Sequence, residues 1–222
     1  MAKIAAVLFD LDETLLDRTQ SLTQFVLAQY QRFYPHVQHV PSAAYLQRVV
    51  ELDAHGAVWK DKVYQQLLAE LQITSVGWEE LLEDYVTHFA GACVGFPNLH
   101  AALGALAAHG YRLGIVTNGR SPFQERNIAA LGIRHYFDTI LVSEAEGVRK
   151  PDAAIFLRAA ARLQARADET VFVGDNAQAD IAGAQRCGMR AIWFAPRAAG
   201  DCAFADAVCN GLDEVLAWVV SR

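Results

Sequence analysis

The sequence predicts an α/β protein, with a doubly wound, Rossmann-like parallel sheet as its core and an all-helical cap domain inserted into it. A continuous apolar run, 5–9, ends in a cluster of acids, as expected of a strand buried on both faces. From about residue 96, strand-like runs alternate with helical patterns, which is typical of parallel pairing. Between these parts, residues 19–91 carry only helical periodicity.

The segment after Phe96-Pro97 contains the remaining elements of the sheet domain in alternation. One helix is expected to begin with Ser121 as its N-cap, Pro122 as its first residue and Gln124 as the capping-box partner. The other expected elements are helices near 99–109, 153–163 and 181–187, and strands near 112–117, 139–143, 170–174 and 190–194.

The helical block interrupts the sheet domain. Its clearest apolar stripe, at the 3.6-residue period, consists of Trp78, Leu81, Leu82, Tyr85, Val86 and Phe89. We therefore expect two domains, one of them discontinuous. Residues 1–17 and 96–222 form the Rossmann-like core, and residues 18–95 form the cap.

Composition limits the classes of function. A net charge of −6 argues against a nucleic-acid polymer or an anionic membrane as partner, because both require a basic surface. The 4 cysteines lack CxxC spacing and fit idle thiols in a reducing compartment. The apolar run near the amino terminus is too short for a signal peptide or a membrane span. We expect a soluble cytoplasmic protein, a monomer or a homodimer.

Polar residues follow several of the predicted strands. In an open parallel sheet, ligands bind outside the carboxyl ends of the strands, so these residues are expected to converge. They are Asp10-Leu11-Asp12-Glu13-Thr14 after the first strand, Thr117-Asn118-Gly119 after the second, and Gly174-Asp175 with Asp180 after a later one; Lys150 lies between the last two groups.

These residue types suit phosphoryl transfer. The reaction needs a nucleophile, a cation that offsets repulsion from the dianionic substrate, donors for the phosphoryl oxygens and an acid for the leaving group. Asp10 and Asp12 beside Asp175 would form an acidic cluster that is costly without a hard cation, and Mg²⁺ fits oxygen ligands. Lys150 supplies a positive charge and Thr117 a hydroxyl donor.

The pattern resembles the haloacid dehalogenase-like hydrolase superfamily, in its phosphatase branch with a helical cap after the first motif. Asp10–Thr14 looks like the DxDxT first motif of that family, Thr117 like the hydroxyl residue of its second motif, and Lys150 like the lysine of its third. Gly174-Asp175 with Asp180 looks like the acidic fourth motif, and the resemblance spans nearly the whole chain.

The resemblance implies a role for each matching residue. Asp10 is the nucleophile that forms an aspartyl-phosphate, and Asp12 protonates the leaving alcohol and then activates water. Thr117 and Lys150 hold the phosphoryl group, with Asn118 contributing through its backbone.

For the metal, the resemblance implies that Asp10, the backbone carbonyl of Asp12 and Asp175 bind Mg²⁺. Asp180 would orient Lys150 or a metal-bound water. Two positions depart from the family pattern: Glu13 stands where glycine is frequent, and Ala179 stands where many relatives have asparagine. The cap cations Arg18 and Lys60 are hypothetical contacts for the substrate.

The favoured function is a magnesium-dependent phosphatase for a small phosphorylated metabolite such as a nucleotide, a sugar phosphate, phosphoglycolate or flavin mononucleotide. Asp12 argues against carbon–halogen cleavage, because a departing halide needs no acid. A phosphomutase of the β-phosphoglucomutase type is the nearest alternative. A non-catalytic phosphoacceptor module is a further one, although such a module needs no inserted cap.

Overall fold

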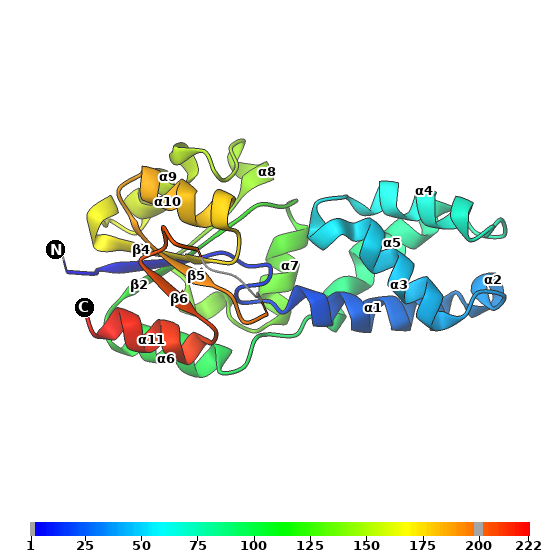
Figure 1. Ribbon diagram of the computed structural model, residues 1–222, viewed down its shortest axis with the longest axis horizontal. Helices are drawn as coiled ribbons and strands as arrows, with labels where there is room; N and C mark the ends of the chain where they lie inside the picture. The colour runs from blue at the N-terminus through cyan, green and yellow to red at the C-terminus, as the bar shows by residue number, and fades with distance from the viewer. Residues whose placement is uncertain (1–2, 198–201) are drawn as a thin grey trace. The chain divides into compact units, whose positions relative to one another are not determined.

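The structure is a computed structural model that describes residues 3–197 and 202–222 (Figure 1). The chain divides into two compact units. The core consists of Met1–Asp17 and Gly95–Arg222, and the cap consists of Arg18–Val94. The cap thus ends one residue earlier than the boundary expected from the sequence.

The core contains a 6-stranded sheet whose pairs are all parallel, in the order β3-β2-β1-β4-β5-β6. Its strands are β1 (Ala6–Phe9), β2 (Arg112–Thr117), β3 (Thr139–Val142), β4 (Thr170–Gly174), β5 (Arg190–Phe194) and β6 (Ala207–Cys209). The order runs outward from β1 in both directions, so the strand order reverses between β1 and β4. The doubly wound, Rossmann-like fold is confirmed. The short edge strand β6 was not predicted, and neither were two helices of the core, Ser143–Glu146 and Leu212–Val220.

Helices cover both faces of this sheet (Figure 1). On one face lie α9 and α10, and on the other α6 packs beside α11 (Figure 1). The helices of the core are α6 (Leu99–Ala108), α7 (Phe123–Ala130), α8 (Ser143–Glu146), α9 (Ala153–Arg162), α10 (Gly183–Arg186) and α11 (Leu212–Val220), and a π-helical segment, Ala177–Ala182, precedes α10.

The expected capping box at the start of α7 is wrong. The helix begins at Phe123, and its N-cap residue Pro122 makes no side-chain cap bond. The Ser121 hydroxyl donates instead to the Glu125 carboxylate at 2.6 Å. The Gln124 side chain is buried and bonds to Asp12. The box does not form because both of its side chains have other partners.

Tight packing around the central strands fixes the geometry of the sheet. All four residues of β1 are buried, as the apolar run predicted. Phe156 on α9 packs edge-on against Phe172 on β4, with ring centroids 5.0 Å apart. Gly114 on β2 lies between its register partners Leu8 and Thr139 on the flanking strands. A Cβ at position 114 would lie 2.7 Å from Leu8 Cδ2 and 2.9 Å from Thr139 Cγ2, so this position requires glycine.

The cap is entirely helical within the part of it that the structure describes. Its interior contains Phe25, Tyr85 and Phe89, whose rings pack 5.0–5.9 Å apart, so the aromatic stripe lines a core. Its helices are α1 (Arg18–Arg32), α2 (Tyr34–Val37), α3 (Ser42–Asp53), α4 (Lys60–Glu70) and α5 (Trp78–His88). Across residues 3–197 and 202–222, no helix has the length and apolar character needed to cross a membrane.

Two Gly→Ala variants test this packing. Gly114→Ala should destabilise the protein by about 1–3 kcal/mol, because the added methyl group overpacks the space between β1 and β3. Gly104→Ala is the matched control. It lies within α6, its nearest neighbour would be Tyr136 at 3.8 Å, and it should stabilise the protein by about 0.5–1 kcal/mol through helix propensity. Urea unfolding measures both, and a neutral Gly114→Ala would contradict the packing argument.

Candidate active site

The candidate site lies at the carboxyl ends of β1, β2 and β4, where the strand order reverses. Asp10 directly follows β1 and Asp175 directly follows β4, which pairs with β1. The backbone N–H of Asp10 donates to the Val173 carbonyl at 2.9 Å, so the pairing of the two strands continues up to the predicted nucleophile. Such a switch point is where open α/β sheets bind ligands.

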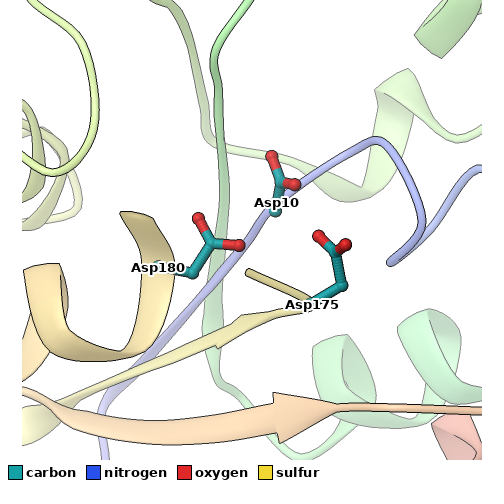
Figure 2. Close-up of side chains that lie close together, drawn as sticks. All are labelled: Asp10, Asp175 and Asp180. Atoms are coloured by element: carbon teal, nitrogen blue, oxygen red, sulfur yellow. The ribbon is translucent and has the colours of Figure 1, made fainter. Parts of the chain in front are cut away.

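Three carboxylates converge here. Asp10, Asp175 and Asp180 each offer an oxygen, and these oxygens lie within 4.8 Å of one another (Figure 2). Asp180 comes from the π-helical segment and reaches back over Gly174, where a Cβ would lie 2.6 Å from Asp180 Cγ. The backbone N–H of Asn176 donates to Asp180 Oδ2 at 3.0 Å and fixes this orientation. Position 174 therefore has to be glycine for Asp180 to join the cluster.

Lys150 is the cation that the structure places against these acids. Its Nζ lies 2.6 Å from Asp10 Oδ1 and 2.7 Å from Asp180 Oδ1, and the residue is 3% exposed. The loop that carries it is fixed by Asn118, whose Nδ2 donates to the Lys150 carbonyl at 3.0 Å and whose Oδ1 accepts from the Lys150 N–H at 2.9 Å. The Asn118 side chain is thus engaged in holding Lys150, which leaves its backbone for the predicted contact with substrate.

The acids oppose one another's ionisation. Burial raises the pKa of Asp10 well above its ordinary value; Lys150 lowers it, whereas Asp180, Asp175 and Asp12 raise it further. Burial, followed by repulsion from Asp180, raises the pKa of Asp175 from 3.8 to about 7. Burial would lower the pKa of Lys150, but Asp10 and Asp180 outweigh it and the pKa rises above its ordinary value. With all three acids ionised, the cluster would carry more negative charge than Lys150 offsets.

This donor set fits a hard divalent cation. Carboxylate oxygens are the ligands that Mg²⁺ takes, and a cation would counteract the burial and the repulsion that raise the pKa values of Asp10 and Asp175. The acids that converge are Asp10, Asp175 and Asp180, and the orienting role predicted for Asp180 stays a prediction. The role predicted for the Asp12 carbonyl stays a prediction.

Thr117 and Asp12 both contact Gln124, a residue that the sequence motifs did not include. Thr117 ends β2 and is buried. Nε2 of Gln124, in the first turn of α7, lies 2.7 Å from Asp12 Oδ2 and 3.0 Å from Thr117 Oγ1. Sequence reasoning missed Gln124 because its position at the start of a helix has a simpler explanation as a cap.

Arg197 is a second residue that sequence reasoning missed. Its guanidinium donates to the Glu13 carboxylate at 3.1 Å and to the carboxylate of Asp17, the last core residue before the cap. It also lies 5.2 Å from the ring centroid of Phe96, just after the chain returns to the core. Glu13 has φ 56°, the left-handed conformation that glycine adopts at least cost, which fits the frequent glycine of the family pattern.

Within the cap, both cations suggested as substrate contacts bind the same buried acid. Arg18 donates to the Asp53 carboxylate at 2.6 and 2.9 Å, and the Lys60 ammonium pairs with the same carboxylate. Burial would raise the pKa of Asp53, but Arg18 and Lys60 outweigh it and hold the pKa below its ordinary value. Arg18 and Lys60 therefore link α1 and α4 to the end of α3. Their contact with substrate stays a hypothesis.

A comparison with protein families identifies the family of this chain. The sequence profile described as haloacid dehalogenase-like hydrolase matches residues 7–194. The chain belongs to the haloacid dehalogenase-like hydrolases. The match includes every predicted site residue of the core, from Asp10 to Asp180, and confirms the resemblance drawn from the four motifs.

Curated relatives of this hydrolase carry phosphatase names. It is 31% identical to the glyceraldehyde 3-phosphate phosphatase of Pyrococcus abyssi over 86% of this chain and 81% of that protein. It is 31% identical to the ribulose-1,5-bisphosphate 5-phosphatase of Halopiger xanaduensis over 88% of this chain and 87% of that protein. A match to the glyceraldehyde 3-phosphate phosphatase of Methanopyrus kandleri is 42% identical but covers 42% of this chain and 40% of that protein.

Solved structures of the family share the fold over the whole chain. A phosphatase of the family from Thermococcus onnurineus superposes with a TM-score of 0.71 at 26% identity, covering 97% of this chain and 98% of that one. The 2-haloacid dehalogenase of Pseudomonas syringae superposes with a TM-score of 0.63 at 29% identity, covering 99% of both chains. The predicted enzyme class, a phosphoric monoester hydrolase of this family, is confirmed by the profile match and the phosphatase-named relatives. Cytoplasmic location and oligomeric state stay predictions.

Asp175→Asn tests the electrostatic argument. In metal-free protein at pH 8, Asp175 is ionised although its folded-state pKa is about 7, compared with 3.8 when unperturbed. The ionised Asp175 therefore lowers the free energy of unfolding, whereas the neutral amide of the variant does not. The variant should be more stable than the wild type by about 2–4 kcal/mol at pH 8, since each pKa unit corresponds to about 1.4 kcal/mol.

The sign of the pH dependence follows from the raised pKa. The folded protein binds more protons than the unfolded chain between pH 3.8 and about 7, so the wild type loses stability as pH rises through this window. The advantage of Asp175→Asn should shrink as pH falls from 7 towards 4, and Mg²⁺ should stabilise the wild type more than the variant. Urea unfolding with EDTA or Mg²⁺ measures both, and a variant less stable than metal-free wild type at pH 8 would contradict the argument.

Proposed function

We propose that this chain is a magnesium-dependent phosphatase that hydrolyses small phosphomonoesters through an aspartyl-phosphate on Asp10. The observation that carries the proposal is the acidic cluster at the end of β1 and β4, with Lys150 paired to both Asp10 and Asp180. An anionic substrate can approach such a cluster only where positive charge outweighs the acids. A bound Mg²⁺, held by Asp10, Asp175 and the Asp12 carbonyl, would supply that charge and polarise the phosphoryl group.

In the first step, Asp10 acts as the nucleophile. One of its carboxylate oxygens attacks phosphorus, the bond from phosphorus to the leaving oxygen breaks, and Asp12 delivers a proton to that oxygen. Thr117 donates its hydroxyl proton to a phosphoryl oxygen, and Lys150 offsets charge beside Asp10. The raised pKa of Asp10 means that its nucleophilic, ionised form depends on the positive charges around it.

In the second step, water releases the phosphoryl group. Asp12, now a carboxylate, takes a proton from the water as the water oxygen attacks phosphorus. The bond between phosphorus and the Asp10 oxygen breaks, which returns Asp10 as a carboxylate and yields inorganic phosphate. The same Asp12 thus acts as an acid in the first step and as a base in the second, because it is left as a carboxylate once it has given up its proton.

Asp12 also distinguishes this reaction from the dehalogenase chemistry named for several solved structures of similar fold. Its carboxylate is held by a dedicated hydrogen bond from Gln124 at 2.7 Å, which suits a residue that transfers protons. A halide leaves as an anion and requires no proton. Chloride release from 2-chloropropionate, without phosphatase activity, would reverse this choice.

The substrates named for relatives define the first panel. Glyceraldehyde 3-phosphate, ribulose 1,5-bisphosphate, phosphoserine and pyrimidine 5′-nucleotides are the substrates of the phosphatases and nucleotidases that this chain resembles. Phosphoglycolate and flavin mononucleotide complete it. A sugar bisphosphate that donates its phosphoryl group without release of phosphate would indicate a mutase.

Phosphate release with Mg²⁺ tests the proposal. Asp10→Asn should lower kcat by at least about 10³-fold on every substrate, since the amide cannot form the covalent intermediate. EDTA should abolish activity and Mg²⁺ should restore it. Arg126→Gln, on the exposed side of α7, serves as the matched control and should keep wild-type rates. Full activity in Asp10→Asn would exclude the aspartyl-phosphate, and an inactive wild type would exclude the phosphatase.

A further inference from the structure

Gln124 joins the ends of two strands through one amide group. The residue is 3% exposed, and its Nε2 lies 2.7 Å from Asp12 Oδ2 and 3.0 Å from Thr117 Oγ1. An amide nitrogen has two protons, and here each proton has one acceptor. Asp12 follows β1 and Thr117 ends β2, so the side chain ties the predicted acid–base residue to the predicted phosphoryl donor.

Asn127 determines which end of the Gln124 amide faces Asp12. Its Nδ2 donates to Gln124 Oε1 at 3.0 Å, and Asn127 is fully buried one turn further along α7. If the Gln124 amide were reversed, its oxygen would face the Asp12 carboxylate and its nitrogen would face the nitrogen of Asn127. Both contacts would then be repulsive, so the observed orientation is the one that satisfies all three neighbours.

Gly119 provides the space that this arrangement needs. A Cβ at position 119 would lie 2.6 Å from Gln124 Cγ and 2.9 Å from its Nε2. The glycine after Thr117-Asn118 therefore allows the Gln124 side chain to pass beside the backbone. This gives Gly119 a role through close approach to Gln124, and no unusual backbone conformation is required of it.

We propose that Gln124 is a positioning residue that orients Asp12 and Thr117 for proton transfer and phosphoryl binding. The inference rests on the proposed function and deepens it. Because Asp12 Oδ2 accepts from Gln124, Oδ1 is the oxygen that carries the proton to the leaving group. Because Thr117 Oγ1 accepts from the same nitrogen, its own hydroxyl proton is directed away from Gln124 and towards the phosphoryl group.

The nature of the leaving group separates this role from a structural one. An alkoxide leaving group needs a proton in the transition state, whereas p-nitrophenolate needs little help. The value of kcat/KM covers the steps up to formation of the aspartyl-phosphate, and so includes departure of the leaving group but not the later attack of water. Misplacing Asp12 should therefore lower kcat/KM for an alkyl phosphate more than for p-nitrophenyl phosphate.

The experiment compares Gln124→Met, which keeps the length of the side chain but has no donor, with the wild type, Asp12→Asn and the exposed control Arg126→Gln. Each is assayed with Mg²⁺ on p-nitrophenyl phosphate and on the best alkyl monoester of the panel. Gln124→Met should lower kcat/KM by about 10–100-fold on the alkyl phosphate and by less than about 5-fold on p-nitrophenyl phosphate. Asn127→Leu, which removes only the bond that orients the amide, should show the same selectivity with a smaller loss.

The outcomes are distinct. An equal loss on both substrates in Gln124→Met, or no loss on either, overturns the inference. Should Gln124→Met fail to fold, as judged by urea unfolding, Asn127→Leu decides the matter by the same ratio. If Asp12→Asn also shows no selectivity between the substrates, or if the wild type releases no phosphate, the proposed function itself fails. If Asp12→Asn shows a selective loss and Gln124→Met does not, the phosphatase function is supported and the positioning role of Gln124 is overturned.

Discussion

The ion pairs of buried Lys150 with Asp10 and Asp180 are the interaction on which the site depends. Carboxylates gathered in a place of low exposure repel one another, and the burial of each one penalises its charge. Lys150 offsets part of that cost and is itself kept charged by the acids, as its raised pKa shows. Asn118 binds both the N–H and the carbonyl of Lys150, so the backbone of the cation is fixed by the residue after Thr117. The second and third motifs, which are far apart in the sequence, thus together determine the position of Lys150.

Close approach is the second constraint, and it explains the glycines of the site. Asp180 can reach Asp10 and Lys150 only by passing over Gly174, and Gln124 can reach Asp12 only by passing beside Gly119. In both cases a methyl group would occupy space that a functional side chain uses. The two glycines are therefore required by the polar groups packed against them, and neither has a positive φ. Glu13 is the contrasting case, because its left-handed φ is what glycine would accommodate and an ion pair with Arg197 accompanies it instead.

The sequence predicted the parts of this structure that follow from a simple pattern. Apolar runs predicted strands β2, β4 and β5 with the bounds that the structure has, and polar residues after β1, β2 and β4 predicted the site. The capping box at Ser121 failed because local propensity describes a helix start but not the distant Asp12 that captures Gln124. Arg197 was missed because it lies in a loop after β5, and only the fold brings it to Glu13 and Asp17. The short strand β6 has too few residues for an alternating pattern to be recognised.

The energetics of the site connect its stability with its chemistry. Burial and mutual repulsion hold the pKa of Asp175 at about 7 and raise that of Asp10, so the acidic cluster is a source of instability in the folded, metal-free chain. Lys150 cannot remove it, because one cation faces several acids. The chemistry of the cluster fits a divalent cation, and such a cation would in turn favour the ionised form of Asp10. The residues of β1 and β4 are all buried, and this burial offsets the unfavourable free energy of the acidic cluster. A substitution that weakens this apolar core should therefore lower the stability of the metal-free protein before it changes the geometry of the site.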